Sequence, residues 1–146
     1  MKTSDLPVIV EHRFNRSIED VWKALTEVSL MTQWFFEDIP DFKPEVGFHT
    51  KFNVKAPSRD FMHLWTITAV IPNNTIVYNW KYDGLAGNSN VTFQLVPEKD
   101  ATKLIVKAEV IEDFDDAIPE FRRDSCEAGW SYFIKERLHN FFLAND

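Results

Sequence analysis

The chain has 146 residues, enough for a single domain spanning 1–146 that buries a substantial core. Its 23 acidic residues outnumber its 16 basic residues, and the net charge of -7 repels phosphate backbones and anionic surfaces, so we expect no nucleic-acid partner and no membrane partner. The first ten residues lack the apolar stretch of a secretion signal, no uncharged run reaches the about 20 residues of a membrane helix, and the one cysteine suits a reducing compartment, so we expect a cytoplasmic protein.

The chain begins with one strand and two short helices. VIVEHRF at 8–14 alternates loosely and is rich in β-branched residues, which predicts a strand. In SIEDVWKALTEV, Ser17 and Asp20 have the spacing of a capping box, and apolar residues follow at intervals of three and four. SLMTQWFF at 29–36 predicts a second, shorter helix, which ends before a loop containing prolines and a glycine.

Five further segments have strand composition and are separated by turn residues. In NVTFQLV, for example, Val91, Phe93 and Leu95 alternate with polar residues, as in a sheet solvated on one side. Turns such as PNN and PEKDAT join neighbouring segments, which predicts an antiparallel meander. The predicted strands are FHTKFNV, FMHLWTITAVI, TIVYNWKY, NVTFQLV and KLIVKAEVI.

The C-terminal segment, from about Ala117, is the element long and apolar enough to cover this sheet. Trp130, Ile134, Leu138 and Phe141 recur at helical spacing, and Phe133 and Phe142 widen this stripe, which predicts a helix with one apolar face. The expected fold class is therefore α+β, with the order strand, helix pair, five-strand meander and long helix.

Four segments in this order resemble a known family. They are RSIEDVWKALTEVSLMTQW, PEVGF, TIVYNW and AGW. The chain is similar, from about Val8 to Phe142, to the activator of heat-shock protein 90 ATPase homologue-like family, within the START-related superfamily of helix-grip domains. The resemblance implies a strongly curved antiparallel sheet gripping the C-terminal helix, with a cavity that holds lipids, sterols, polyketides or other apolar small molecules in relatives. It supplies no catalytic signature.

Two positions depart from the family pattern. Relatives often have a Gly-Gly pair where this chain has Val46-Gly47, and a glycine is common where this chain has Trp65. A Trp at that position could fill space that a ligand would otherwise occupy.

The chain is rich in aromatic residues, and this set has two interpretations. Aromatic side chains make up 14% of the sequence and suit either a packed core or the wall of an apolar pocket. With the resemblance, we expect a binding module for an apolar small molecule or lipid; a co-chaperone-like interaction domain, with a possible chaperone contact, and a cyclase or hydrolase enzyme are the alternatives. The expected ligand-binding residues are Trp34, Phe52, Trp65, Trp80, Phe93, Trp130 and Ile134.

The remaining reactive side chains do not form a catalytic or metal-binding motif. Cys126 lies one turn before Trp130, so we expect its thiol to serve packing and not nucleophilic chemistry. His12, His49, His63 and His139 show no metal-ligand spacing. We therefore expect no catalytic residue, no metal and no cofactor. A buried acid, base or His inside the cavity would favour the enzyme alternative.

Overall fold

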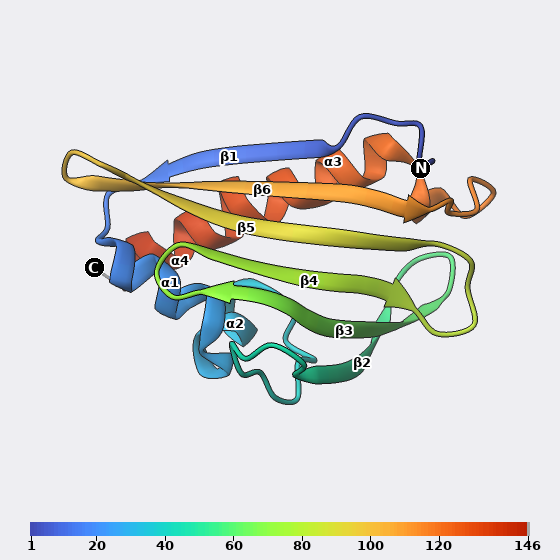
Figure 1. The fold of residues 1–146 in the computed structure, drawn as a ribbon, viewed down its shortest axis with the longest axis horizontal. Coiled ribbons are helices and arrows are strands. Elements are labelled where there is room, and N and C mark those ends of the chain that lie inside the picture. Colours follow the sequence, from blue (N-terminus) through green and yellow to red (C-terminus); the bar gives the residue numbers. More distant parts are fainter. Residues whose placement is uncertain (146) are drawn as a thin grey trace.

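A six-stranded antiparallel sheet and a long C-terminal helix form the framework of the protein, and the computed structural model describes residues 1–145. The predicted α+β class and the order of the elements are confirmed (Figure 1). The strands are β1 (Val8–Phe14), β2 (His49–Lys55), β3 (Asp60–Ile71), β4 (Thr75–Tyr82), β5 (Asn88–Glu98) and β6 (Ala101–Glu112). The helices are α1 (Ile18–Thr26), α2 (Val28–Trp34), the 3₁₀ turn η1 (Pro119–Phe121), α3 (Arg123–Ser131), the π-helical segment η2 (Tyr132–Leu138) and α4 (His139–Ala144).

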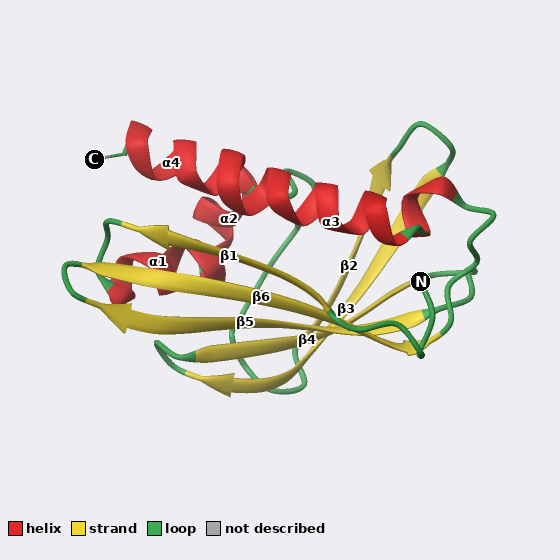
Figure 2. Ribbon diagram, turned by 90° about the horizontal axis from the view of Figure 1, so that it is seen from above, coloured by secondary structure: helices red, strands yellow, loops and turns green. Residues whose placement is uncertain are grey.

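The sheet has the order β1-β6-β5-β4-β3-β2, so β2 to β6 form a meander and β1 pairs with its last strand. In the view from above, the sheet curves around the C-terminal helix, and the tip of the β2–β3 hairpin rises beside α3 (Figure 2). Helices α1 and α2 lie on the same side of the sheet as the C-terminal helix, near the end of that helix formed by α4. The curved sheet that the family resemblance implied is therefore present.

Alternation along each strand decides which side chains face the helix. In β3 the buried residues are Phe61, His63, Trp65 and Ile67, while the residues between them are partly exposed. The register between β3 and β4 shifts between Ile67 and Ala69, a local irregularity that increases twist. The inward face of β3 is thus built almost entirely from large rings.

The two short helices are joined to each other by a buried side chain. The Ser17 hydroxyl accepts a hydrogen bond from the Asp20 amide at 3.1 Å, which is the cap predicted for α1. At the end of α2, the Trp34 Nε1–H donates to the Ala24 carbonyl at 2.8 Å. This bond satisfies the indole donor in a fully buried position and holds the helix pair together.

The C-terminal helix changes from α to π geometry in its middle. Its buried residues, Trp130, Ile134, Leu138 and Phe142, are each four positions apart. At 3.6 residues per turn, a spacing of four overshoots a full turn by about 40°, so an all-α helix would rotate this stripe away from the sheet. The π segment has more residues per turn, which reverses that drift. At the end of the stripe Phe142 is buried and Phe141 is only partly buried, although the sequence pattern places both on this face.

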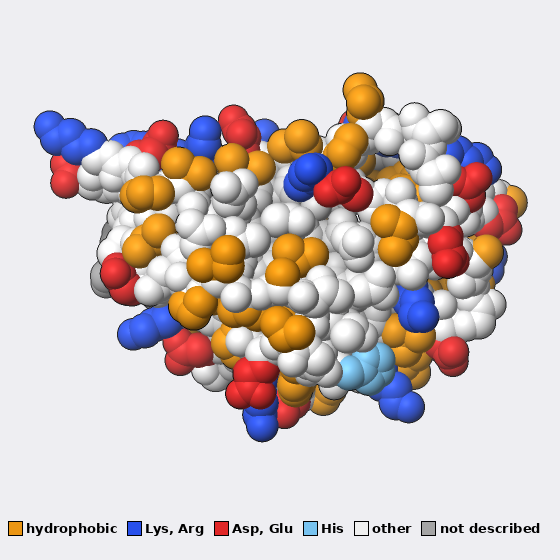
Figure 3. All heavy atoms as spheres, viewed as in Figure 1, with side chains coloured by type: hydrophobic (Ala, Val, Ile, Leu, Met, Phe, Trp, Pro, Cys, Tyr) orange, Lys and Arg blue, Asp and Glu red, His pale blue; other side chains and the backbone are white. Residues whose placement is uncertain are grey.

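The face of the sheet that points away from the helix carries single hydrophobic side chains among polar ones, and most charges lie around its rim (Figure 3). Ile9 and Ile111 are among its exposed hydrophobic residues. Isolated side chains of this kind are ordinary on protein surfaces.

Candidate ligand cavity

A cavity of about 140 Å³ lies between the inward face of the sheet and α3. Its wall combines β4, β5 and β6 on one side with η1, α3 and the start of the π segment on the other. The wall is predominantly apolar, as is typical of small-molecule pockets. The lining residues are Met1, Phe36, Trp80, Tyr82, Ser89, Val91, Ala108, Val110, Phe114, Glu120, Phe121, Cys126, Gly129, Trp130 and Phe133.

The structure divides the seven expected ligand-binding residues into two groups. Trp80 and Trp130 lie on the cavity wall, with their ring centroids 5.5 Å apart. The other five lie in the packed core, outside the cavity lining: Trp34, Phe52, Trp65, Phe93 and Ile134. The sequence predicts these residues as pocket lining from their large apolar side chains and the family resemblance, which do not show where the packing leaves space.

The region beneath α2 is filled by an aromatic core, which we define as Phe35, Phe42, Trp65, Tyr78 and Phe93. The Trp65 ring is 1% exposed and lies 5.0 Å from Tyr78 and 5.6 Å from Phe35. Phe35 also lies 5.9 Å from Trp130, and Trp65 lies 5.0 Å from Trp80, so the aromatic core packs directly against the cavity wall. Trp65 therefore fills space beneath α2, whereas the cavity lies between the sheet and α3.

Trp65 stabilises the folded protein less than the burial of its apolar ring suggests. Its Nε1 is buried and has no hydrogen-bond acceptor among residues 1–145. An unpaired buried donor costs about 1–3 kcal/mol.

Two hydrogen bonds organise the polar atoms of the cavity wall. The Trp80 Nε1–H donates to the Tyr82 hydroxyl oxygen at 2.9 Å. The Ser89 hydroxyl donates to the Trp80 carbonyl at 2.8 Å, across the β4–β5 pair. Burial raises the pKa of Tyr82, so its phenol is neutral at physiological pH.

Cys126 also lines the cavity, but its environment does not activate it. Burial raises the pKa of its thiol to about 11, with smaller opposing effects from nearby charges such as Arg123. The reactive form of cysteine is the thiolate. At neutral pH the group is therefore a protonated, weakly polar part of the wall.

His63 is a buried histidine beside the cavity that the sequence analysis did not assign to the site. It is 4% exposed, and its ring stacks on Phe52 at 4.9 Å and meets Tyr82 edge-on at 4.8 Å. Its Nδ1 lies 3.0 Å from the Phe61 carbonyl oxygen, which can only accept, so the proton is on Nδ1 in the neutral ring. Burial lowers the pKa of His63 to about 4. The period-two alternation of FMHLWTI is the sequence signal that identifies His63 as an inward-facing residue.

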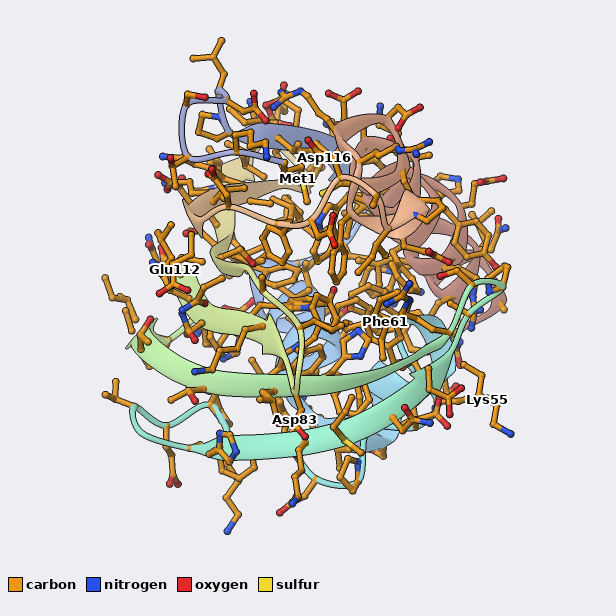
Figure 4. All side chains as sticks on the ribbon, turned by 90° about the vertical axis from the view of Figure 1, so that its right-hand side faces the viewer. Met1, Lys55, Phe61, Asp83, Glu112 and Asp116 are labelled. Carbon is orange, nitrogen blue, oxygen red and sulfur yellow. The ribbon has the colours of Figure 1, made fainter. Side chains whose placement is uncertain are left out.

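The end of the cavity near η1 is held by contacts from three separate segments. The Ser58 hydroxyl at the β2–β3 tip donates to Glu120 at 2.6 Å, and this bond lowers the pKa of the Glu120 carboxyl. Phe61 lies 5.3 Å from Phe121 beneath that tip. Seen from this end, Phe61 lies between the sheet and the helix, with Met1 above it as drawn (Figure 4).

The β4–β5 connection closes the same end from another side. Gly87 has a φ of +114°, and a side chain there would place its Cβ 2.2 Å from Cδ1 of Phe114. Only glycine fits this approach without displacement. The segment GLAGNS therefore supports a ring of the cavity wall through Gly87.

A curved antiparallel sheet that wraps a long C-terminal helix and leaves a cavity between the two defines the helix-grip class of proteins. One family in this class is described as Activator of Hsp90 ATPase homolog 1-like protein. The sequence model of that family matches residues 15–142. The chain belongs to this family. No curated protein matches the sequence significantly.

Solved structures of similar chains share this fold. Protein MLL2253 from Mesorhizobium loti is 30% identical, with a TM-score of 0.72, and the match covers 96% of this chain and 98% of that one. BH1534 from Bacillus halodurans is 25% identical over 92% of this chain and 95% of that one, with a TM-score of 0.69. DynU16, a protein of the dynemicin biosynthetic locus, has a TM-score of 0.78 at 20% identity, which shows the shared fold. The match covers 97% of this chain but spans about half, 49%, of DynU16.

No helix within residues 1–145 is long and apolar enough to cross a membrane. Over the same residues, no three His, Cys, Asp or Glu side chains are grouped so that they could hold a metal ion.

Proposed function

We propose that this protein binds a small apolar molecule, about the size of one aromatic ring, in the cavity between the sheet and α3. The observation that carries the proposal is the cavity of about 140 Å³, walled by Trp80, Trp130, Phe133 and Phe36. An apolar cavity of about 150 Å³ in another protein stays dry and binds benzene or xenon. Drug-sized ligands occupy roughly 300–1,000 Å³, so a whole lipid or sterol would require the wall to move.

The wall chemistry favours binding over the hydrolytic alternative. The Cys126 thiol is protonated at neutral pH and provides no thiolate nucleophile. His63 carries its proton toward Phe61 and lies outside the cavity lining, behind Tyr82. The co-chaperone-like alternative gains no specific support, because the exposed large hydrophobic residues are dispersed: Leu6, Ile9, Val46, Ile71, Ile111, Tyr132 and Leu143.

Thermal unfolding with toluene tests this proposal. At a free concentration of about ten times its dissociation constant, a ligand of the native state adds about 1.4 kcal/mol. Average unfolding entropies give roughly 0.3 kcal/mol per degree for a chain of this length, so we expect a rise in Tm of about 5 °C.

A cavity-filling variant supplies the control. A Cβ at Gly129 meets no atom within 4 Å, and Gly129 lines the cavity, so Gly129→Leu should fill the space and abolish the toluene shift. Ala128→Leu adds the same side chain at the exposed neighbouring position and should retain the shift. A shift that is absent in the wild type, or equal in all three proteins, would contradict binding in this cavity.

A further inference from the structure

Among residues 1–145, no residue accepts the proton of the Tyr82 hydroxyl. In its bond with Trp80 the indole N–H can only donate, so the phenol oxygen is the acceptor. Trp80 is the one hydrogen-bond partner of this hydroxyl among residues 1–145. The phenolic proton is therefore left to donate to something else, and Tyr82 lies on the cavity wall.

The surrounding rings hold this donor in a fixed position. Tyr82 contacts His63, Phe121 and Phe61, with ring centroids 4.8, 5.1 and 5.4 Å away. A donor whose orientation is set before the ligand arrives loses little conformational freedom on binding. Because burial also keeps the phenol protonated, the group presents an O–H throughout the physiological pH range.

The other polar groups of the wall are already engaged or have a different character. The Ser89 hydroxyl donates within the β4–β5 pair, and the Cys126 thiol is a weak donor. The Glu120 carboxylate is held by Ser58 and places a negative charge on the wall, which disfavours an anionic ligand. The cavity thus combines an apolar wall with an uncommitted phenolic donor at Tyr82.

We propose that Tyr82 is the specificity-determining residue of the cavity and donates a hydrogen bond to an acceptor oxygen, such as a ketone or ether, on a neutral single-ring ligand. This inference rests on the proposed binding function. It adds the polar chemistry that distinguishes a preferred ligand from an aromatic hydrocarbon of the same shape.

The test compares two probes of nearly equal shape, acetophenone and α-methylstyrene. Acetophenone has a carbonyl oxygen where α-methylstyrene has a methylene group. Dissociation constants are measured by NMR titration for the wild type and for Tyr82→Phe. We expect the preference for acetophenone, taken as the ratio of the two constants, to fall by about five- to tenfold in Tyr82→Phe. The ratio cancels the general difference in hydrophobicity between the probes.

Tyr78→Phe is the matched control, because Tyr78 faces the same side of β4 but lies in the aromatic core, outside the cavity lining. Its ratio should equal that of the wild type. A ratio that stays unchanged in Tyr82→Phe, with both probes binding, overturns the role of Tyr82 and leaves the proposed function standing. Failure of both probes to bind the wild type overturns the proposed function itself.

A measurement on the wild type keeps the test decisive if Tyr82→Phe does not fold. A hydrogen bond lowers the carbonyl stretching frequency of acetophenone. We expect bound acetophenone to absorb at a lower frequency than it does in hexane, and a hexane-like frequency would overturn the proposal.

Discussion

Acidification below pH 6.5 should destabilise this protein through His63. The ring is enclosed by Phe36, Phe52 and Tyr82, with centroids 4.8–4.9 Å away, and a charged imidazolium there would lose its hydration. Burial lowers the pKa of the folded state from 6.5 to about 4. The unfolded chain therefore binds a proton as the pH falls below 6.5, while the folded protein does not until about pH 4.

The magnitude follows from that difference between the two states. The unfolding free energy is independent of this group above pH 6.5 and declines by up to about 1.4 kcal/mol per pH unit below it. Over the whole window from 6.5 to about 4 the loss is roughly 3 kcal/mol. Below the folded pKa both states are protonated and the loss stops growing.

Urea unfolding at about pH 7 and about pH 4.5, for the wild type and His63→Phe, isolates this contribution. We expect the wild type to lose about 2–3 kcal/mol more than the variant between these conditions, because Phe cannot be protonated. His49→Phe, at an exposed position of β2, should lose as much as the wild type. Equal losses in the wild type and His63→Phe would refute a buried neutral imidazole.

Four further substitutions test the packing of the cavity wall and of the core. Gly129→Ala should raise the unfolding free energy by about 0.5–1 kcal/mol, because the methyl group enters open space and alanine favours the helix; a lower Tm would contradict this. Gly87→Ala should cost roughly 2–4 kcal/mol in urea unfolding, because its φ is positive and its Cβ collides with Phe114, and a neutral result would show that this contact is loose. Trp65→Phe should cost about 1–2 kcal/mol less than Trp34→Phe, since only Trp34 loses an indole hydrogen bond, to Ala24; equal costs would argue against the unpaired Trp65 donor.

The strands and the first helix could be predicted because their signals are local. Period-two alternation identifies the inward face of β3, and the spacing of Ser17 and Asp20 marks the start of α1. The π segment could not be predicted in this way. The π segment allows Trp130 and Phe142, at opposite ends of the helix, to face the same sheet. That requirement comes from the packed structure and not from a local sequence pattern.

The cavity could be predicted only as an expectation from resemblance. Trp65 and Trp80 face the same side of neighbouring strands and are paired in register, yet only Trp80 lines the cavity. Which ring meets open space depends on the packing around each ring: Trp65 is enclosed by Phe35, Tyr78 and Trp80, whereas Trp80 also borders the space between the sheet and α3. The volume of a cavity is a small difference between the space that the sheet and helices enclose and the space that their side chains fill. No sequence pattern gives that difference.

Intermolecular nuclear Overhauser effects between toluene and the protein test the central claim most directly. If toluene occupies the cavity, its protons should contact the side chains of Trp80, Trp130 and Phe133, and should not contact Trp34. This result would locate the ligand in the cavity between the sheet and α3. Contacts confined to exposed side chains, or contacts with Trp34 in the filled region, would contradict the account.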